Sequence, residues 1–269
     1  MSMYWPSQLL PKKLLKFLWR GTACYCNVCK SSTRSFAARG HSYTAITELE
    51  VVGAGKRWVD CRVCGSSDRD RLLWEYLEPK LLQSPQASID VLHIAPEMSI
   101  AQALRTLPSV QYVAVDKRTP GYYYPHWVQH ADIETEFSTQ PTQFDFILCG
   151  HVLEHVHNDF RALQQLIKKL KPQGQLLLSV PIALGLAETR EFPLKQWLTL
   201  SQDEKIRMFG QADHLRLYGR DYLQRWPLGS HTVPEAWSIY ESILDENSLS
   251  FHGLNPKERL IIFSKKCVG

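Results

Sequence analysis

Four cysteines form two pairs whose spacing is typical of metal ligands. The pairs are Cys26 with Cys29 and Cys61 with Cys64. A Cys-x-x-Cys turn points two sulfur atoms at one position, and zinc prefers four tetrahedral thiolate or imidazole ligands. The two pairs together therefore predict one complete zinc site. Because four thiolates leave no open coordination position, we expect this zinc ion to be structural.

The surroundings of these cysteines leave alternatives open. Cys24 lies two residues before Cys26 and could serve as a ligand in its place, or pack as a small apolar residue. A redox-active pair and four unrelated buried thiols are the competing interpretations. Between the two pairs we expect a hairpin, with strands over Thr44–Val52 and Lys56–Val59.

A second group of reactive side chains follows apolar segments farther along the chain. His93, Glu97, Asp116 and His151 each lie at or just beyond the end of such a segment. Apolar strands that alternate with helices indicate a parallel sheet covered on both faces, and ligands bind at the carboxyl ends of its strands. The predicted strands are Ile89–Ala95, Tyr112–Asp116, Phe144–Cys149 and Gln175–Val180, and the predicted helices are Ile100–Leu107 and Asp159–Leu170.

Length and charge narrow the class of protein. A chain of 269 residues with 44% apolar composition can bury one sizeable α/β core and a small appendage. The net charge is +4, but the first 72 residues carry twelve Lys and Arg against five Asp and Glu. The cysteine spacing does not resemble a secreted disulfide framework, and no apolar run approaches the ~20 residues that span a bilayer. We therefore expect a cytoplasmic protein.

Residues 1–22 are predicted to form a basic amphipathic helix. Lys12, Lys13, Lys16 and Arg20 fall on one arc of a helical wheel, and apolar side chains fill the remainder. Such a helix either packs on its own domain or makes peripheral contact with an anionic membrane, here through residues 8–20.

Several short segments, taken in order, resemble a known family. They are Val91–Glu97, Val113–Asp116, Ala131–Ile133, Phe144–Val156, Leu170–Pro181 and Phe209–Gly219. In this order they resemble the class I S-adenosylmethionine-dependent methyltransferases of the type 11-like group. The chain is most similar there to a subfamily with an N-terminal zinc-binding module of four cysteines, and the similarity spans residues 20–266.

The resemblance implies a fold and a domain organisation. It implies a Rossmann-like, seven-stranded α/β methyltransferase sheet preceded by a zinc-ribbon-like module. The expected parts are the N-terminal helix at 1–22, the zinc module at 23–66, a connecting helix at 67–88 and the methyltransferase domain at 89–269, with an insertion or lid at 182–226. Ser67 and Asp70 are spaced to cap the connecting helix.

The resemblance also implies which residues bind S-adenosylmethionine. Asp116 corresponds to the carboxylate that accepts both ribose hydroxyls, a role that suits a strand end. Asp132 and Ile133 correspond to the pair that meets the adenine amino group and ring. Gly150 and His151 follow the fourth strand and belong to the same expected cleft.

The first loop of this cleft departs from the family pattern because it contains no glycine. It reads His93, Ile94, Ala95, Pro96 and Glu97, and Pro96 has no amide donor and a fixed φ. We expect His93, Ala95, Pro96 and Glu97 to border the cofactor. The Glu97 carboxylate could receive its α-amino group, or Glu97 could simply favour the start of a helix.

Methyl transfer from a sulfonium centre is an in-line displacement, so a base is needed only when the acceptor loses a proton. His151 is the candidate base, or packs beside the cofactor. In the insertion, Asp213, His214 and Tyr218 are candidates for a base or a substrate contact, and the alternative is a lid held by internal hydrogen bonds.

The leading hypothesis is therefore a zinc-module methyltransferase with a small-molecule, glycan or lipid-linked acceptor. One rival is an RNA methyltransferase whose basic module follows phosphates. The other is a binding protein that kept the fold and lost turnover.

Overall fold

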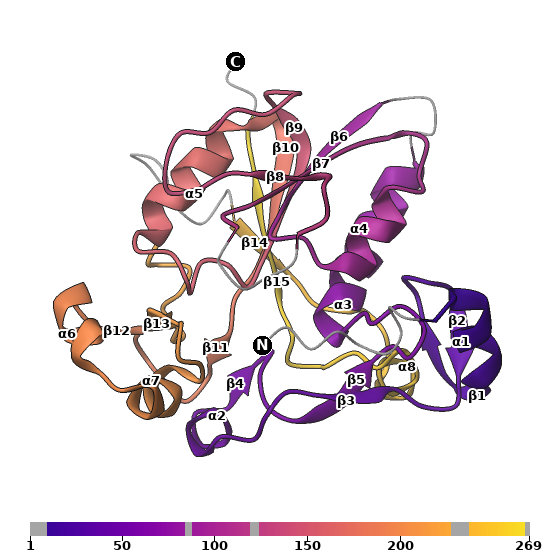
Figure 1. The fold of residues 1–269 in the computed structure, drawn as a ribbon, viewed down its shortest axis with the longest axis horizontal. Coiled ribbons are helices and arrows are strands. Elements are labelled where there is room, and N and C mark those ends of the chain that lie inside the picture. The colour runs from indigo at the N-terminus through magenta and orange to yellow at the C-terminus, as the bar shows by residue number, and fades with distance from the viewer. Residues whose placement is uncertain (1–9, 84–87, 119–123, 227–236, 267–269) are drawn as a thin grey trace.

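Seven strands form one mixed sheet at the centre of the computed structural model, which describes residues 10–83, 88–118, 124–226 and 237–266 (Figure 1). The strand order is β14-β15-β10-β9-β6-β7-β8. Their bounds are β6 Ile89–Ile94, β7 Val110–Asp116, β8 Val128–His130, β9 Phe144–Gly150, β10 Leu170–Ser179, β14 Trp237–Tyr240 and β15 Leu260–Ser264. The predicted Rossmann-like seven-stranded sheet is confirmed.

The order of the strands places a binding edge at the middle of the sheet. Strands β6, β7, β8, β9 and β10 run parallel, whereas β15 runs antiparallel to both β10 and β14. The chain starts the sheet at β6 and extends it in both directions, so the order reverses between β6 and β9. Ligands of such sheets bind beyond the carboxyl ends at this point. The antiparallel strands β14 and β15 complete the sheet beyond β10.

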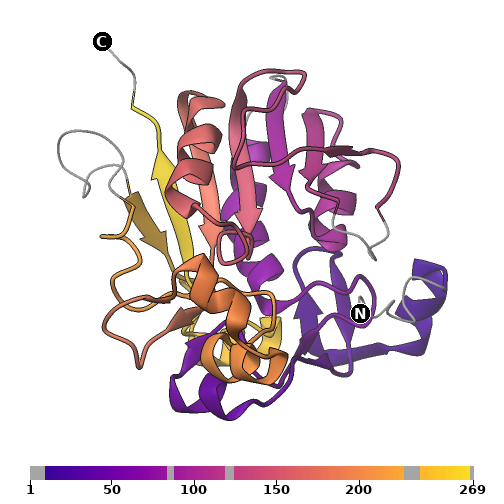
Figure 2. The same cartoon turned by 60° about the vertical axis from the view of Figure 1, so that its left-hand side comes forward.

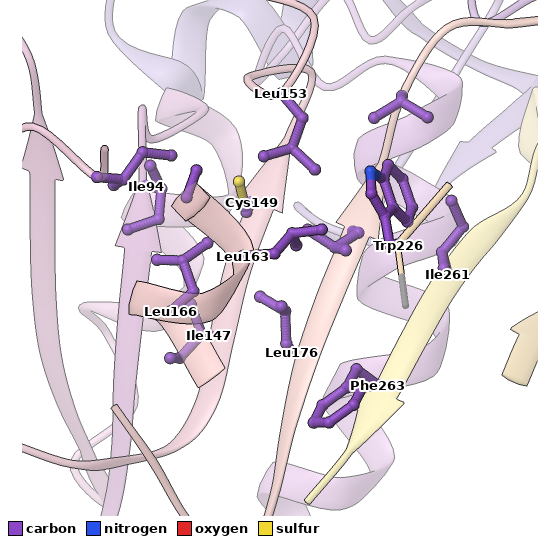
Figure 3. Close-up of a cluster of buried hydrophobic side chains, with 14 of the residues drawn as sticks. Ile94, Ile147, Cys149, Leu153, Leu163, Leu166, Leu176, Trp226, Ile261 and Phe263 are labelled. Atoms are coloured by element: carbon purple, nitrogen blue, oxygen red, sulfur yellow. The ribbon is translucent and has the colours of Figure 1, made fainter. Parts of the chain in front are cut away.

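Helices cover both faces of the sheet, as the apolar strands required. On one face α5 (Asp159–Lys168) places Leu163 and Leu166 in a cluster with Ile147 and Leu176, which Figure 3 shows together with Trp226. On the other face α3 (Asp68–Leu82) and α4 (Met98–Leu104) pack on alternate residues of the same strands. Side chains of successive strand residues point to opposite faces, which explains this division.

The helix that follows the second cysteine pair begins at the predicted cap. The Ser67 side chain accepts a hydrogen bond from the Asp70 amide, and the Asp70 carboxylate accepts one from the Ser67 amide at 3.0 Å. This reciprocal capping box satisfies two amides that would otherwise lack partners. It also fixes the backbone of the first helical turn, which carries Arg69.

The N-terminal helix is shorter than predicted. Helix α1 spans Lys12–Leu18, and Arg20 already belongs to β1 (Arg20–Cys26), which pairs with β2 (Ser31–Thr33). Leu15 is buried, whereas the Phe17 side chain is 75% exposed. Residues 1–9 lie outside the described residues, so membrane contact through 8–20 stays a prediction. Among the described helices, none combines the length and the apolar character that a membrane span needs.

The predicted hairpin between the cysteine pairs is wrong. Residues Thr44–Glu48 form helix α2, and the short strand β4 (Val51–Val52) pairs with β11 (Ile182–Ala183). The other predicted strand is present as β5 (Arg57–Asp60), but it pairs with β3 (Ala37–Arg39).

Backbone geometry at the two glycines explains why this hairpin does not form. Gly53 and Gly55 have φ of 76° and 84°, and Arg57 donates to both of their carbonyls at 3.1 Å. Arg57 also binds Asp68 through two nitrogens at 2.7 and 3.0 Å. These left-handed turns, which glycine adopts without steric cost, and the hydrogen bonds of Arg57 direct β4 away from β5. The zinc module therefore shares a strand pair with the insertion.

The insertion lies at the same end of the sheet as the N-terminal region (Figures 1 and 2). Its described elements are β11, β12 (Arg190–Glu191), α6 (Leu194–Thr199), α7 (Gln202–Phe209) and β13 (Arg216–Leu217). Helix α8 (Glu246–His252) precedes β15 and contacts β1 of the zinc module. Two regions far apart in the sequence thus meet over the carboxyl ends of the central strands. The predicted domain boundaries themselves stay a prediction.

Candidate functional site

The four predicted metal ligands converge on one point. The Sγ atoms of Cys26 and Cys64 are 3.7 Å apart, as are those of Cys29 and Cys61, and all four lie within 4.8 Å of one another. A tetrahedral ion with Zn–S bonds of about 2.3 Å separates its sulfur ligands by about 3.8 Å. The four residues therefore fit a structural zinc ion. Cys24 is not part of this group and lies on β1 opposite Thr33.

The second cysteine pair sits on a tight turn that the backbone itself stabilises. The Gly65 amide donates to the Cys61 carbonyl at 2.8 Å, and the Val63 amide donates to the Cys61 Sγ at 3.4 Å. Gly65 has φ of 77°, a conformation that glycine adopts without steric cost. This turn directs both sulfurs of the second pair toward the first pair.

The glycine-free first loop makes its turn with a strained alanine. Ala95 follows β6 with φ of 48°, and its amide donates to the Val115 carbonyl at 2.8 Å. His151, after β9, has φ of 52°. A left-handed conformation costs a residue with a side chain about 1–2 kcal/mol. Strained residues thus stand at the ends of the two adjacent strands where the order reverses, a place where strain is often linked to function.

His93 was predicted to border the cofactor, and the structure corrects this. The ring is fully buried, with Nδ1 at 3.0 Å from the Tyr112 hydroxyl and Nε2 at 2.7 Å from Glu97 Oε2. Both ring nitrogens therefore already have partners inside the protein. His93 orients Glu97 instead, because it holds one carboxylate oxygen and leaves the other toward Gly150.

Glu97 and Gly150 approach each other closely. A Cβ atom added to Gly150 would lie 2.7 Å from Glu97 Oε1, so only glycine fits beside this carboxylate. Burial alone would raise the pKa of Glu97, but the contact with His93 holds that pKa below its ordinary value. Glu97 occupies the position before α4 without using its side chain as a cap. An ionised carboxylate therefore stands between β6 and β9.

The structure brings Asp116, Asp132 and Ile133 together at the ends of β7 and β8. The Ala131 amide donates to the Asp116 carbonyl at 2.9 Å, and Asp116 Oδ1 accepts from the Arg118 amide at 2.9 Å. Asp132 is already engaged, since Oδ2 lies 2.9 Å from Lys117 Nζ and Oδ1 accepts from the Glu134 amide. Their roles toward a ligand stay predictions.

A cavity of about 490 Å³ opens beside the end of β9. Its walls come from residues 39–57 of the N-terminal region, from Arg69 on α3, from His151 and from residues 206–214 of the insertion. A Cβ added to Gly53 would lie 3.1 Å from His151 Cε1, so the glycine turn lies directly against this ring. The β4–β11 pair joins two of these walls. The cavity therefore depends on the pairing that the sequence did not predict.

His151 faces this cavity with one ring nitrogen free of protein partners. Nδ1 lies 3.2 Å from Glu154 Oε1, and the buried Nε2 has no hydrogen bond to any residue that the structure describes. Burial, with a contribution from Arg69, lowers the pKa of His151 to about 4. Burial is the largest single influence on Glu154 and opposes its ionisation, but the contacts with His151, His155 and His214 together outweigh it and lower the pKa of Glu154 to about 2. A neutral imidazole thus stands next to a buried carboxylate.

The insertion contributes Asp213 and His214 to the same cavity, but not Tyr218; the roles of Asp213 and His214 toward a substrate stay predictions. Tyr218 is fully buried, and its hydroxyl donates to Asp159 Oδ2 at 3.0 Å. The expectation that Tyr218 contacts a substrate is corrected, because its side chain packs against Trp226 inside the core. Tyr218 instead helps to hold the insertion by internal hydrogen bonds.

Three further residues of the site were not found from the sequence. Arg69 lies at the junction of the large cavity and a smaller cleft that contains Glu97 and Gly150. Glu154 contacts the His151 ring, and Glu258 Oε2, like His151 Nε2, lies 3.4 Å from the position of a Cβ added to Gly53. For Arg69, the available signal in the sequence was its place in the first turn of the capped helix. No local pattern marks Glu258, which comes from the loop before β15.

Replacement of a cysteine ligand should abolish the tetrathiolate site. In protein loaded with Co²⁺, we expect thiolate-to-cobalt charge-transfer absorption corresponding to about one ion per chain, because four thiolates surround the metal. Cys26→Ser should lose this band and lower the melting temperature, whereas Cys24→Ser should retain both. Equal spectra for the two variants would show that the ligand set is wrong.

Glu258 should make stability depend on pH. Its side chain is buried, and Oε2 has no hydrogen-bond partner among the described residues. Burial and the nearby Asp68 carboxylate raise the pKa of Glu258 from 4.5 to about 7, although the positive charges of Arg69 and Arg57 act in the opposite direction. The neutral form is favoured in the folded state, so this contribution is complete below pH 4.5 and is lost as the pH rises through 7. Relative to Glu258→Gln, the wild type should lose about 3 kcal/mol of unfolding free energy between about pH 5 and 8. Denaturant titrations measure this, and parallel curves would contradict it.

Comparison with known proteins identifies the family. A family model described as a methyltransferase domain matches residues 54–226. No curated protein sequence matches the chain. Among solved structures, the CurJ carbon methyltransferase is 16% identical, with 73% of this chain and 54% of that chain covered and a TM-score of 0.41. The chain thus spans about half the length of that structure.

Two other structures show similar likeness. The plantazolicin methyltransferase BpumL, in complex with a pentazolic desmethylPZN analog and SAH, is 15% identical, with 73% and 84% of the two chains covered and a TM-score of 0.43. An S-adenosylmethionine-dependent methyltransferase from Clostridium acetobutylicum is 16% identical, with 40% and 49% covered and a TM-score of 0.30. Because the family model matches more than half of the chain, this protein belongs to the methyltransferase domain family.

Proposed function

We propose that this protein transfers a methyl group from S-adenosylmethionine to a small polar acceptor, free or as the end group of a glycan or lipid-linked molecule. The observation that carries this proposal is the cavity of about 490 Å³ beside His151, at the carboxyl edge of the family's sheet. Its volume falls within the roughly 300–1,000 Å³ of small-molecule sites. Its lining combines an aromatic residue such as Tyr43 with polar groups such as Gln211 and Asp213.

The cofactor would lie along the ends of β6, β7 and β9. Its methionine part carries an ammonium and a carboxylate. Glu97 and Arg69, which lie at the same junction, carry the opposite charges that would bind these two groups. Among the described residues, no hydrogen bond or ion pair engages the Arg69 guanidinium. Asp116 has one carboxylate oxygen beyond the bond to Arg118, so it can accept a ribose hydroxyl. Asp132 and Ile133 would border the adenine.

The protein's part in the reaction is alignment and exclusion of water. An in-line displacement needs the acceptor atom, the methyl carbon and the sulfur on one line in a desolvated site. His151 is in position to border both cofactor and acceptor, and its unpartnered Nε2 could take a proton from a hydroxyl acceptor. The walls formed by residues 39–57 and 206–214 would keep water from the reacting atoms.

An RNA acceptor is the alternative that the basic N-terminal region leaves open. Two of its arginines are already engaged, since Arg62 and Arg34 lie 3.9 and 5.6 Å from the centroid of the Trp19 ring. Because both guanidinium groups stack on Trp19, these two arginines have a structural role that needs no nucleic acid. We therefore favour the small polar acceptor, and the assay below includes RNA.

Asp116→Ala should weaken binding of S-adenosylhomocysteine, measured by calorimetry, by about 1–3 kcal/mol, because the charge-assisted hydrogen bonding to the ribose is lost. Asp145→Ala is the matched control. Asp145 accepts from the Asp90 amide and from Lys171 at the opposite end of the sheet, so its loss should lower stability and leave affinity unchanged. Unchanged affinity in Asp116→Ala would remove the ribose contact from the proposal.

Ala212→Trp should block the acceptor without touching the cofactor, because Ala212 lines the large cavity and lies apart from the cofactor residues. With labelled methyl donor and fractions of polar metabolites, glycans, lipids and RNA, the wild type should label a small polar product. Ala212→Trp should lower the rate by roughly tenfold or more, about 1.4 kcal/mol of barrier. Lys195→Trp, exposed on α6, is the control.

Label found only in RNA would favour the rival acceptor. Cofactor binding without label in any fraction would favour a protein that binds and does not turn over. Equal rates for Ala212→Trp and wild type would contradict the assignment of the cavity.

A further inference from the structure

A carboxylate and two imidazoles meet beside the large cavity, whose lining includes one of them, His214, and this group is separate from the four cysteines. Glu154, His155 and His214 each place one ligand atom within 4.8 Å of the others. Glu154 and His155 come from the turn after β9, and His214 comes from the insertion just before β13. The Leu215 amide donates to the Glu154 carbonyl at 2.8 Å, so the backbone fixes the two segments together.

Glu154 is a buried carboxylate that the protein leaves without hydrogen bonds. Its residue is 0% exposed, and neither Oε1 nor Oε2 has a hydrogen-bond partner among the described residues. Removing an ionised carboxylate from water is very unfavourable unless a cation or hydrogen-bond donors take the place of water. The nearest polar group is the neutral imidazole of His151, whose Nδ1 lies 3.2 Å from Oε1. The other oxygen still lacks a partner.

The two histidines are arranged as metal ligands usually are. His214 Nδ1 lies 3.0 Å from the Phe209 carbonyl, so this nitrogen carries the proton, and the buried Nε2 keeps a lone pair without a partner. His155 Nδ1 lies 3.4 Å from Asp213 Oδ2, which favours the same tautomer. A metal-bound histidine typically donates its other N–H to a carbonyl or carboxylate, which sets the ring orientation and the free nitrogen.

From this geometry we infer a second metal site, for a divalent first-row transition ion, held by Glu154, His155 and His214. Two imidazoles and one carboxylate suit such ions and leave coordination positions open. His214 and Asp213 also line the large cavity, so the proposed ion would lie next to the space assigned to the acceptor. The role of the ion rests on the proposed function: as a Lewis acid it would bind an acceptor oxygen and favour transfer of that oxygen's proton to His151 Nε2.

This site differs in chemistry from the four-cysteine site. Thiolates select zinc, whereas a site of nitrogen and oxygen ligands also accepts Mn²⁺, which binds thiolates poorly. The alternative explanation is that His151 alone compensates Glu154 and that no ion binds. Binding of Mn²⁺ would therefore distinguish the new site from the structural zinc site, and its absence would favour compensation by His151 alone.

The test is Mn²⁺ binding to the full chain with its four-cysteine site loaded with zinc, counted by electron paramagnetic resonance and calorimetry. The wild type should bind about one Mn²⁺ per chain, and Glu154→Gln and His214→Ala should weaken binding at least about tenfold. His155→Ala should do the same, and its side chain is 34% exposed, so this variant keeps the test valid if a core variant fails to fold. His157→Ala, an exposed histidine two residues farther along, should bind like the wild type.

A wild type that stays folded and binds no Mn²⁺ would overturn the site, as would equal binding by wild type and His155→Ala. The readout needs no methyl transfer. S-Adenosylhomocysteine affinity, measured on the same samples, reports on the cofactor cleft independently. A failure of the proposed transfer reaction therefore cannot be mistaken for a failure of the metal site.

Discussion

The side of the cavity that the insertion forms depends on one buried guanidinium group, that of Arg216. Its residue is 1% exposed, and it donates to the carbonyls of Leu153, Val156 and His157 at 2.6, 2.7 and 3.0 Å, and to Glu191. A turn buried without partners for its carbonyls would be strongly destabilised. Arg216 supplies these partners, so the turn that carries Glu154 and His155 can be irregular and still be fixed against the insertion.

A second buried arginine, Arg71, donates hydrogen bonds to main-chain carbonyls in the same way, on the side of the zinc module. Arg71, fully buried, donates to the carbonyls of Val59 and Ser66 in the zinc module and of His252 and Gly253 at the end of α8, at 2.6–2.7 Å. Each guanidinium offers five donors in a rigid plane, which suits several carbonyls at once. The module and the insertion are thus each attached to the sheet by hydrogen bonds to the main chain, and the cavity lies between them.

The sequence predicted what local patterns determine. The strands of the central sheet, the Ser67 cap and the four cysteines follow from periodicity, capping chemistry and ligand spacing, which act within a few residues. The hairpin prediction failed because the partner of β4 is β11, about 130 residues away, and no pattern near Val51 reveals it. Tyr218 failed for a similar reason, since Asp159 and Trp226 decide its environment. Arg69, Glu154 and Glu258 matter through partners that only the fold brings near.

The same reasoning indicates where acceptor specificity lies. The family match covers residues 54–226 and so includes the turn after β9 and the insertion, whereas the cavity wall from Arg39 to Val51 lies before it. That wall belongs to the N-terminal region, whose position depends on the four cysteines and on Arg71. A shared catalytic edge can then serve different acceptors if the added module supplies the contacts that differ. On this argument, loss of the structural metal would disturb acceptor binding first, because the cofactor residues on β6, β7 and β9 are held by the sheet itself.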